Sequence, residues 1–197
     1  MRCEKILGNI NDPSYEIVLR RELGGAFETD EVLLDWDETR RRRLRKTSEG
    51  GIDVGICLGE AGLSEPLRDG DVLGTVEGPV PVAVVVRLRS AEAYLIEVDR
   101  MEPLALAHAC WEIGNMHAPL FRGDSDEFTV RLLTPAMPVV DRMLAGIDGV
   151  RVRTVTTELD ASQRFRTRAT EVVVSLAQNF KIVKKGQAQE TAQTEVI

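Results

Sequence analysis

Histidine and cysteine are both scarce in this chain of 197 residues. The two histidines are His108 and His117, and the three cysteines, Cys3, Cys57 and Cys110, are far apart and odd in number. No C-x-x-C pair occurs, so the pattern excludes a disulfide framework and a structural zinc site built on cysteine pairs. We therefore expect a reducing, cytoplasmic compartment.

The chain also lacks a basic excess and a long apolar run. Its 25 lysines and arginines are outnumbered by 32 aspartates and glutamates, which gives a formal net charge of −7. A general binder of nucleic acid or anionic membrane needs the opposite balance, because it must neutralise phosphates. The most apolar run, PVPVAVVV at residues 79–86, is too short to cross a bilayer, and the N-terminus lacks the apolar stretch of a signal peptide. We expect neither a nucleic acid nor a membrane as partner.

Signatures of common enzyme sites are missing as well. The sequence contains no phosphate-binding G-x-x-x-x-G-K-[ST], no H-E-x-x-H and no G-x-S-x-G. Gly55, Gly59 and Gly62 do not have the spacing of a dinucleotide-binding loop. Cys110 lies seven residues before His117, but helical spacing directs it into the core, so packing explains it better than catalysis. We expect no enzymatic activity and assign no catalytic residue.

What is present indicates an α+β protein whose N-terminal domain, residues 1–89, is rich in β-structure. Short runs of branched residues, separated by Gly, Asp and Pro, predict strands at residues 17–23, 31–37, 54–58 and 71–76. The basic run RRRRLRK at residues 40–46 fits a further strand, with Arg41, Arg43 and Arg45 on one face. Its charges either protect a solvated sheet edge or form a docking surface for an acidic partner, and the pattern leaves both open.

From residue 90 onward the spacing of the apolar residues is partly helical instead of strand-like, and residues 90–158 predict a ferredoxin-like βαββαβ domain. The expected elements are a strand at 92–98, a helix from Pro103 to Gly114, a hairpin turning at 122–126, a second helix from Thr134 and a strand at 150–159. Residues 159–197 are expected to form a basic segment followed by a disordered tail.

Helical spacing also predicts which faces of the two helices are buried. The first helix is expected to bury a broad arc of Leu104, Leu106, Ala107, Cys110, Trp111 and Ile113. The second is expected to use Thr134 as N-cap and Pro135 as first residue, and to bury Val140, Met143, Leu144 and Ile147.

His117 lies on a constrained loop between the expected helix end and Pro119. Either it is a surface or capping residue, or it is a metal ligand. A single imidazole binds a metal ion only weakly. Two imidazoles brought together by the twofold axis of a homodimer bind it better. His108 and Glu112, one turn apart on the wet side of the same helix, are a second candidate, although an exposed pair of small energetic value explains them as well.

The text around His117, GNMHAPL, resembles the GNxHxPL motif of the UreE family of urease accessory metallochaperones. Four further stretches, KILGNI, LLDWDETRRRRLRK, GIDVGICL and LRDGDVL, resemble that family in the same order across residues 4–158. The resemblance implies a partner- or peptide-binding N-terminal domain and a metal-binding ferredoxin-like domain. It also implies a homodimer that carries nickel(II) to the urease assembly complex and its GTPase UreG, with His117 and its symmetry mate as central ligands.

Two departures from the family's pattern concern the ligands. Many members carry a second histidine five residues before the motif histidine, where this chain has Glu112, and many end in a histidine-rich tail, which this chain lacks. Glu112 is a candidate oxygen ligand and His108 a candidate substitute. Nitrogen ligands alone would also accept zinc or copper, so nickel follows only from the resemblance. The rivals are a metal-independent assembly scaffold that binds proteins and a carboxylate-based hydrolase.

Overall fold

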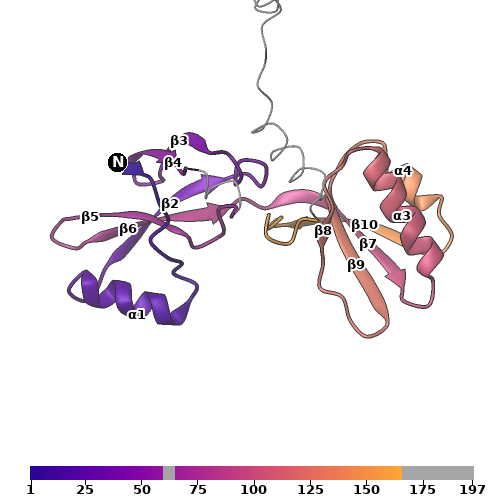
Figure 1. The fold of residues 1–197 in the computed structure, drawn as a ribbon, viewed down its shortest axis with the longest axis horizontal. Coiled ribbons are helices and arrows are strands. Elements are labelled where there is room, and N and C mark those ends of the chain that lie inside the picture. The colour runs from indigo at the N-terminus through magenta and orange to yellow at the C-terminus, as the bar shows by residue number, and fades with distance from the viewer. Residues whose placement is uncertain (60–64, 166–197) are drawn as a thin grey trace, which may run out of the picture. The chain divides into compact units, whose positions relative to one another are not determined.

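The computed structural model describes residues 1–59 and 65–165 (Figure 1). Within them the chain is α+β: a β-rich N-terminal part is followed by a C-terminal domain of strands and two helices. The fold class predicted from the sequence is confirmed. The basic and disordered tail expected in the sequence lies outside the described residues from position 166 onward.

Six strands lie in the described residues of the N-terminal part. They are β1 (Arg2–Cys3), β2 (Glu28–Leu34), β3 (Arg43–Thr47), β4 (Asp53–Cys57), β5 (Val72–Val76) and β6 (Val82–Leu88). One sheet has the order β1-β4-β3 and the other β2-β6-β5, with β2 parallel and β5 antiparallel to β6. Because side chains alternate along a strand, one set from each sheet meets in a shared core, which includes Val32, Leu34, Ile56, Val84 and Val86.

A helix, α1 (Pro13–Glu22), stands where branched residues at 17–23 suggested a strand, so that prediction was wrong. Asp12 is the N-cap: its carboxylate accepts a hydrogen bond from the backbone N–H of Ser14 at 2.9 Å, and a proline fills the first turn. Leu19 is buried in a cluster with residues of β5 and β6. A capped N-terminus and one buried contact outweigh the strand preference of the two branched residues.

The basic run begins before β3, so Arg41 does not join the expected arginine face. Arg43 and Arg45 are exposed on β3, an edge strand of its sheet within the described residues. Arg45 pairs with Asp53 on β4 at 2.6 Å, and Lys46 pairs with another carboxylate at 2.6 Å. Part of the run is thus neutralised within the chain.

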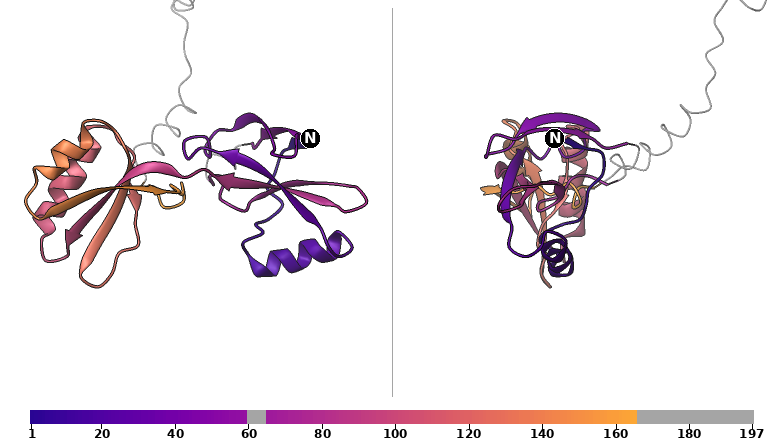
Figure 2. Two further views of the ribbon diagram at one scale, coloured as in Figure 1. Left: turned by 180° about the vertical axis from the view of Figure 1, so that it is seen from behind. Right: turned by 90° about the vertical axis from the view of Figure 1, so that its left-hand side faces the viewer.

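The C-terminal domain has the order βαββαβ expected from the sequence. Its elements are β7 (Ala91–Asp99), α3 (Pro103–Asn115), β8 (Phe121–Arg122), β9 (Thr129–Pro135), α4 (Val140–Ala145) and β10 (Val150–Thr157). The strands form an antiparallel sheet in the order β10-β7-β9-β8, which is the split β-α-β arrangement. Both helices cover the same face of this sheet (Figures 1 and 2).

The buried side of α3 differs from the arc expected from periodicity. The helix buries Ala105, Ala109 and Ile113, partly buries Leu106 and Cys110, and exposes Leu104, Ala107 and Trp111. The buried stripe repeats every four residues and contains two alanines, which let the helix approach the sheet closely. The larger side chains of the neighbouring stripe are therefore turned outward.

The second helix starts later than expected, because Thr134 is not its N-cap. Thr134 and Pro135 belong to β9, which stays paired with β7 through Pro135 and Ala93. The helix begins at Val140 and is capped by Val139, after a second proline. Pairing with a central strand outweighs a Thr-Pro capping signal. The expected burial of Val140, Leu144 and Ile147 is confirmed, and Met143 is partly exposed. No helix in the described part of the chain is long and apolar enough to cross a membrane.

Candidate metal centre

His117 lies directly beyond the C-terminus of α3. The helix continues past Gly114, its expected end, and is capped by Met116. The backbone N–H of His117 donates to the carbonyl of Gly114 at 3.0 Å, and that of Ala118 donates to the carbonyl of Ile113 at 3.1 Å. These two bonds form a Schellman motif, in which the residue at the position of His117 has a left-handed backbone.

The backbone of His117 is left-handed, with φ 54°, and it is the only non-glycine residue with a positive φ in residues 1–59 and 65–165. Glycine usually takes this position, because a left-handed conformation costs an L-residue about 1–2 kcal/mol. Histidine tolerates it better than a branched residue does. The chain keeps an imidazole where the backbone favours glycine, and such strained residues concentrate at functional sites.

The loop after His117 is fixed by buried contacts, while the imidazole of His117 is exposed. Ala118 is buried, and the carbonyl of Pro119 accepts a hydrogen bond at 2.9 Å from the hydroxyl of Thr134, which is fully buried. The ring of His117 is exposed and makes no hydrogen bond or ion pair with any described residue. Both ring nitrogens are therefore open to a ligand, on a backbone that does not move freely.

His108 and Glu112 lie one turn apart on α3, as expected. The Nε2 atom of His108 is 3.5 Å from Oε1 of Glu112, and their side chains are 54% and 22% exposed. Within the described residues neither of them makes a hydrogen bond or ion pair with His117, and residues 1–59 and 65–165 hold no group of three or more His, Cys, Asp or Glu side chains placed to bind a metal. The described part of one chain therefore offers separate ligands and no complete cage.

Two of the three cysteines are poor competitors for a metal. Burial raises the pKa of the Cys110 thiol and of the Cys3 thiol, so both stay protonated at neutral pH. A thiol must lose its proton to act as a strong metal ligand. This agrees with the expectation that Cys110 packs beside the core.

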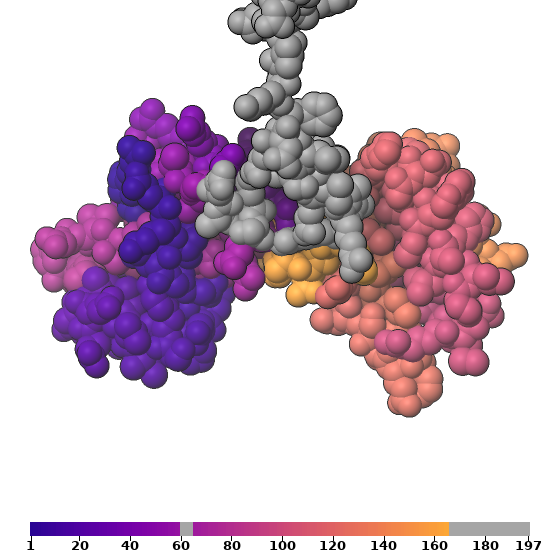
Figure 3. Space-filling view, in the orientation of Figure 1, coloured from indigo at the N-terminus to yellow at the C-terminus, as the bar shows by residue number. Residues whose placement is uncertain are grey.

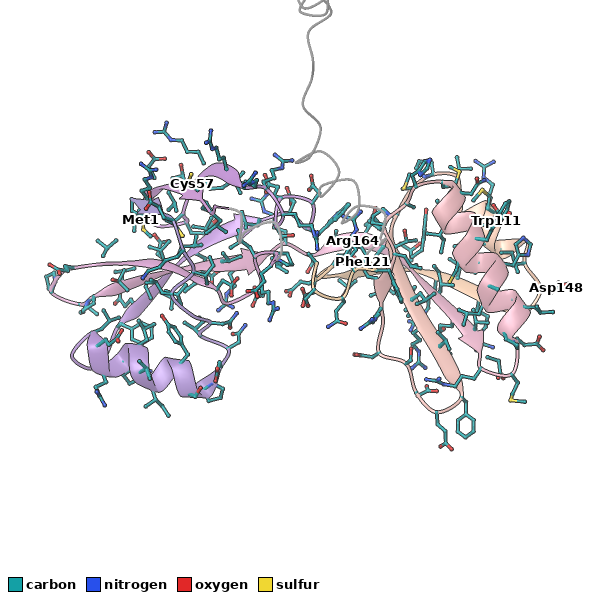
Figure 4. The ribbon with its side chains drawn as sticks, viewed as in Figure 1. Met1, Cys57, Trp111, Phe121, Asp148 and Arg164 are labelled. Carbon is teal, nitrogen blue, oxygen red and sulfur yellow. The ribbon has the colours of Figure 1, made fainter. Side chains whose placement is uncertain are left out.

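The outer face of α3 carries apolar side chains that nothing in the described chain covers. Trp111, labelled in Figure 4, is 62% exposed, and Leu104 is 83% exposed. An indole of this size is rarely left in water without a partner. The sequence pattern missed this face because it assigned both residues to the core.

The fold and these features define a small α+β protein that presents an exposed imidazole on an ordered backbone at a helix end. Residues 3–87 match the family described as UreE urease accessory protein, N-terminal domain, and residues 93–179 match its C-terminal domain. Together these matches cover most of the chain, which therefore belongs to the UreE family of urease accessory proteins.

Individual relatives agree with this assignment. The urease accessory protein UreE of Helicobacter pylori strain HPAG1 is 30% identical over 193 residues, covering 94% of this chain and 100% of the relative. That of Helicobacter acinonychis has the same identity and coverage. That of Acetivibrio thermocellus is 35% identical over 135 residues, covering 68% of this chain and 74% of the relative. The chain is an accessory protein of urease assembly and not an enzyme.

Proposed function

We propose that the protein delivers nickel(II) for assembly of the urease active site, as a homodimer that binds the ion between the two copies of His117. The observation that carries this proposal is the free, exposed imidazole on the left-handed backbone at the end of α3. The donor set fits a divalent ion of borderline softness, because neutral imidazole suits nickel, zinc and copper alike. The urease context, given by the family, favours nickel as the cargo.

A second copy of the chain would supply what one chain lacks. Most homodimers have a twofold axis, which places the same residue of each copy on opposite sides of the axis. Two His117 rings facing each other give two nitrogen ligands, and the exposed Trp111 on the same helix offers apolar area for the contact. The partial negative charge at the C-terminus of α3 adds attraction for a cation.

Glu112 and His108 are the further ligands that we propose. Glu112 lies in the last turn of α3, where a carboxylate oxygen could complete the coordination of the ion, and His108 is one turn away. Two imidazoles, carboxylates and water hold a divalent ion less firmly than a closed cage of cysteines does. Weak coordination suits a carrier, which must release the ion to its recipient.

The recipient we propose is the urease apoprotein with its accessory complex, through the GTPase UreG. Residues 1–89 would bind protein partners and residues 90–158 would bind the metal. The compartment we propose is the cytoplasm, where thiols remain reduced; all three cysteines of the chain are free.

Nickel titration of two matched variants tests the metal site. His117→Ala is expected to remove the one nickel ion bound per dimer, while His108→Ala, which removes a proposed additional ligand, is expected to keep the ion and to bind it more weakly. Calorimetry gives the stoichiometry, and mass measurement shows whether both variants remain dimers. Tight binding that survives in His117→Ala would overturn the site. A wild-type melting temperature that nickel leaves unchanged would favour a metal-independent scaffold.

A further inference from the structure

A second exposed apolar surface lies at the opposite end of α3 from His117. Met101, Leu104 and Phe128 are 84%, 83% and 71% exposed, although each is a large apolar side chain. We call these three residues the 101–104–128 patch. The patch is at the N-terminal end of a helix of 13 residues, about 20 Å from the other end.

Two loops are joined at this patch by hydrogen bonds from the backbone and the side chain of Arg100. The N–H of Arg100 donates to the carbonyl of Phe128 at 2.8 Å, and the Nε atom of Arg100 donates to the carbonyl of Asp126 at 2.9 Å. Met101 directly follows Arg100, and its own N–H donates to the carboxylate of Asp99 at 2.8 Å. The loop before α3 and the loop between β8 and β9 are thus joined, which brings their exposed apolar residues to one place.

The loop that carries Phe128 is held in one conformation. The Asp126 carboxylate accepts hydrogen bonds from the N–H of Phe128 at 2.9 Å and of Thr129 at 2.7 Å, and it pairs with Arg131 at 2.8 Å. Those bonds hold the pKa of Asp126 below its usual range. The space-filling view shows this loop projecting from the surface of the domain (Figure 3). A ring presented on an ordered loop loses little entropy on binding, which is the property of an interface anchor.

Acidic side chains surround the patch. The two loops, residues 99–102 and 124–128, contain five carboxylates and one arginine. Asp148, labelled in Figure 4, adds a further exposed carboxylate, since the adjoining Gly149 lies against Glu102 and Ala105 at the start of α3. An acidic rim attracts a basic surface and repels both a second copy of the same rim and an anionic membrane.

We propose that the 101–104–128 patch docks a protein of the urease assembly machinery that has an apolar socket in a basic surface. Met101 and Phe128 enter the socket, and the acidic rim guides the approach. Because the patch is about 20 Å from His117 along α3, this partner binds without covering the metal site, so docking and release of the ion take place on one receiving complex. The identity of the partner rests on the proposed function, while the surface rests on exposure, ordered loops and charge.

Binding measurements with purified urease apoprotein and purified accessory GTPase as separate immobilised probes test this proposal. The double variant Met101→Ser/Phe128→Ser is expected to bind its recipient at least about 30-fold more weakly, as loss of an interface anchor does. The matched control Val139→Ser removes an apolar side chain that is 51% exposed in the same domain but outside the patch, and it is expected to bind like wild type. Glu102→Lys/Glu127→Lys is expected to slow association at low salt and to have less effect at high salt.

Nickel titration of the same proteins separates this proposal from that of the metal site. The patch variant is expected to keep its nickel and its dimeric mass, whereas His117→Ala loses nickel and still binds the protein probe. Affinity for both probes within about twofold of wild type in the patch variant overturns the docking surface. Dissociation of that variant into monomers also overturns it, because the patch would then be covered by a second copy.

Discussion

Replacement of His117 by glycine should stabilise the metal-free protein while abolishing nickel binding. The residue has φ 54° and donates one bond of the Schellman motif through its backbone N–H, while Ala118 donates the other, so glycine keeps both bonds and removes the strain. The left-handed conformation costs an L-residue about 1–2 kcal/mol, and the greater freedom of glycine in the unfolded chain cancels about 0.5–1 kcal/mol of this. We therefore expect a net gain of up to about 1 kcal/mol, or about 2–4 °C in melting temperature for a chain of this size.

His117→Ala is the comparison that isolates the backbone contribution. Alanine also removes the imidazole but keeps a Cβ atom, so it keeps most of the strain and should melt close to the metal-free wild type. Nickel should reverse the order of stability. At a free concentration 100 times the dissociation constant, a ligand that binds only the native state stabilises it by about 2.7 kcal/mol. Wild type should then be more stable than either variant.

The assay is thermal or urea unfolding of the three proteins at equal concentration, with chelator and with excess nickel. If the glycine variant is less stable than the alanine variant in chelator, the left-handed backbone at His117 is wrong. If the glycine variant is stabilised by nickel as much as wild type is, the imidazole is not the ligand. Each outcome refutes a different part of the reasoning.

Two further substitutions test the support of the site and the charged face of the sheet. Thr134→Val should lower the free energy of unfolding by about 1–2 kcal/mol in urea, because the carbonyl of Pro119 loses its buried donor. It should also weaken nickel binding severalfold, because the loop that carries His117 is held less firmly. The control is Thr156→Val at an exposed position, and equal effects of the two substitutions would contradict this explanation. The hydrogen bond from Arg131, together with the charge of Arg153, holds the pKa of Glu97 below its ordinary value. Its contribution to stability is therefore present above pH about 4.3 and is lost as pH falls through the folded-state pKa. Glu97→Gln should be less stable than wild type by about 0.5–1 kcal/mol at pH 7, and the difference should vanish in denaturation curves once the pH is below the folded-state pKa of Glu97. A difference independent of pH would refute the ionic cause.

Much of the fold could be predicted from local signals. Alternating branched residues marked most of the strands, and Pro103 marked the start of α3. The errors arose where two local signals competed. Branched residues at 17–23 suggested a strand although an Asp-Pro-Ser cap began a helix there, and Thr134-Pro135 resembled a helix start although β7 kept that segment in the sheet. The contribution of a neighbouring strand is not visible in the segment itself.

The candidate site was located by pattern, but its physical character was not. The motif GNMHAPL directed attention to His117 and placed it at a helix end. Its left-handed backbone could not be foreseen, because it depends on where α3 stops, and the sequence suggested Gly114 as the cap. Likewise, periodicity assigned Leu104 and Trp111 to the core, because it shows that a helix has an apolar face without showing how the helix is rotated.

Composition and motif order, which are properties of the chain alone, determined the class of the protein: a chain with few histidines, acidic overall, α+β, and a member of a urease accessory family. The tertiary structure decided which apolar residues are left in water and which imidazole is free. The first depends on the rotation of α3 against its sheet, where two alanines let the helix approach closely, and the second depends on where α3 ends, because the Schellman motif there presents His117. That rotation is fixed by packing between segments distant in sequence, so no single segment encodes it.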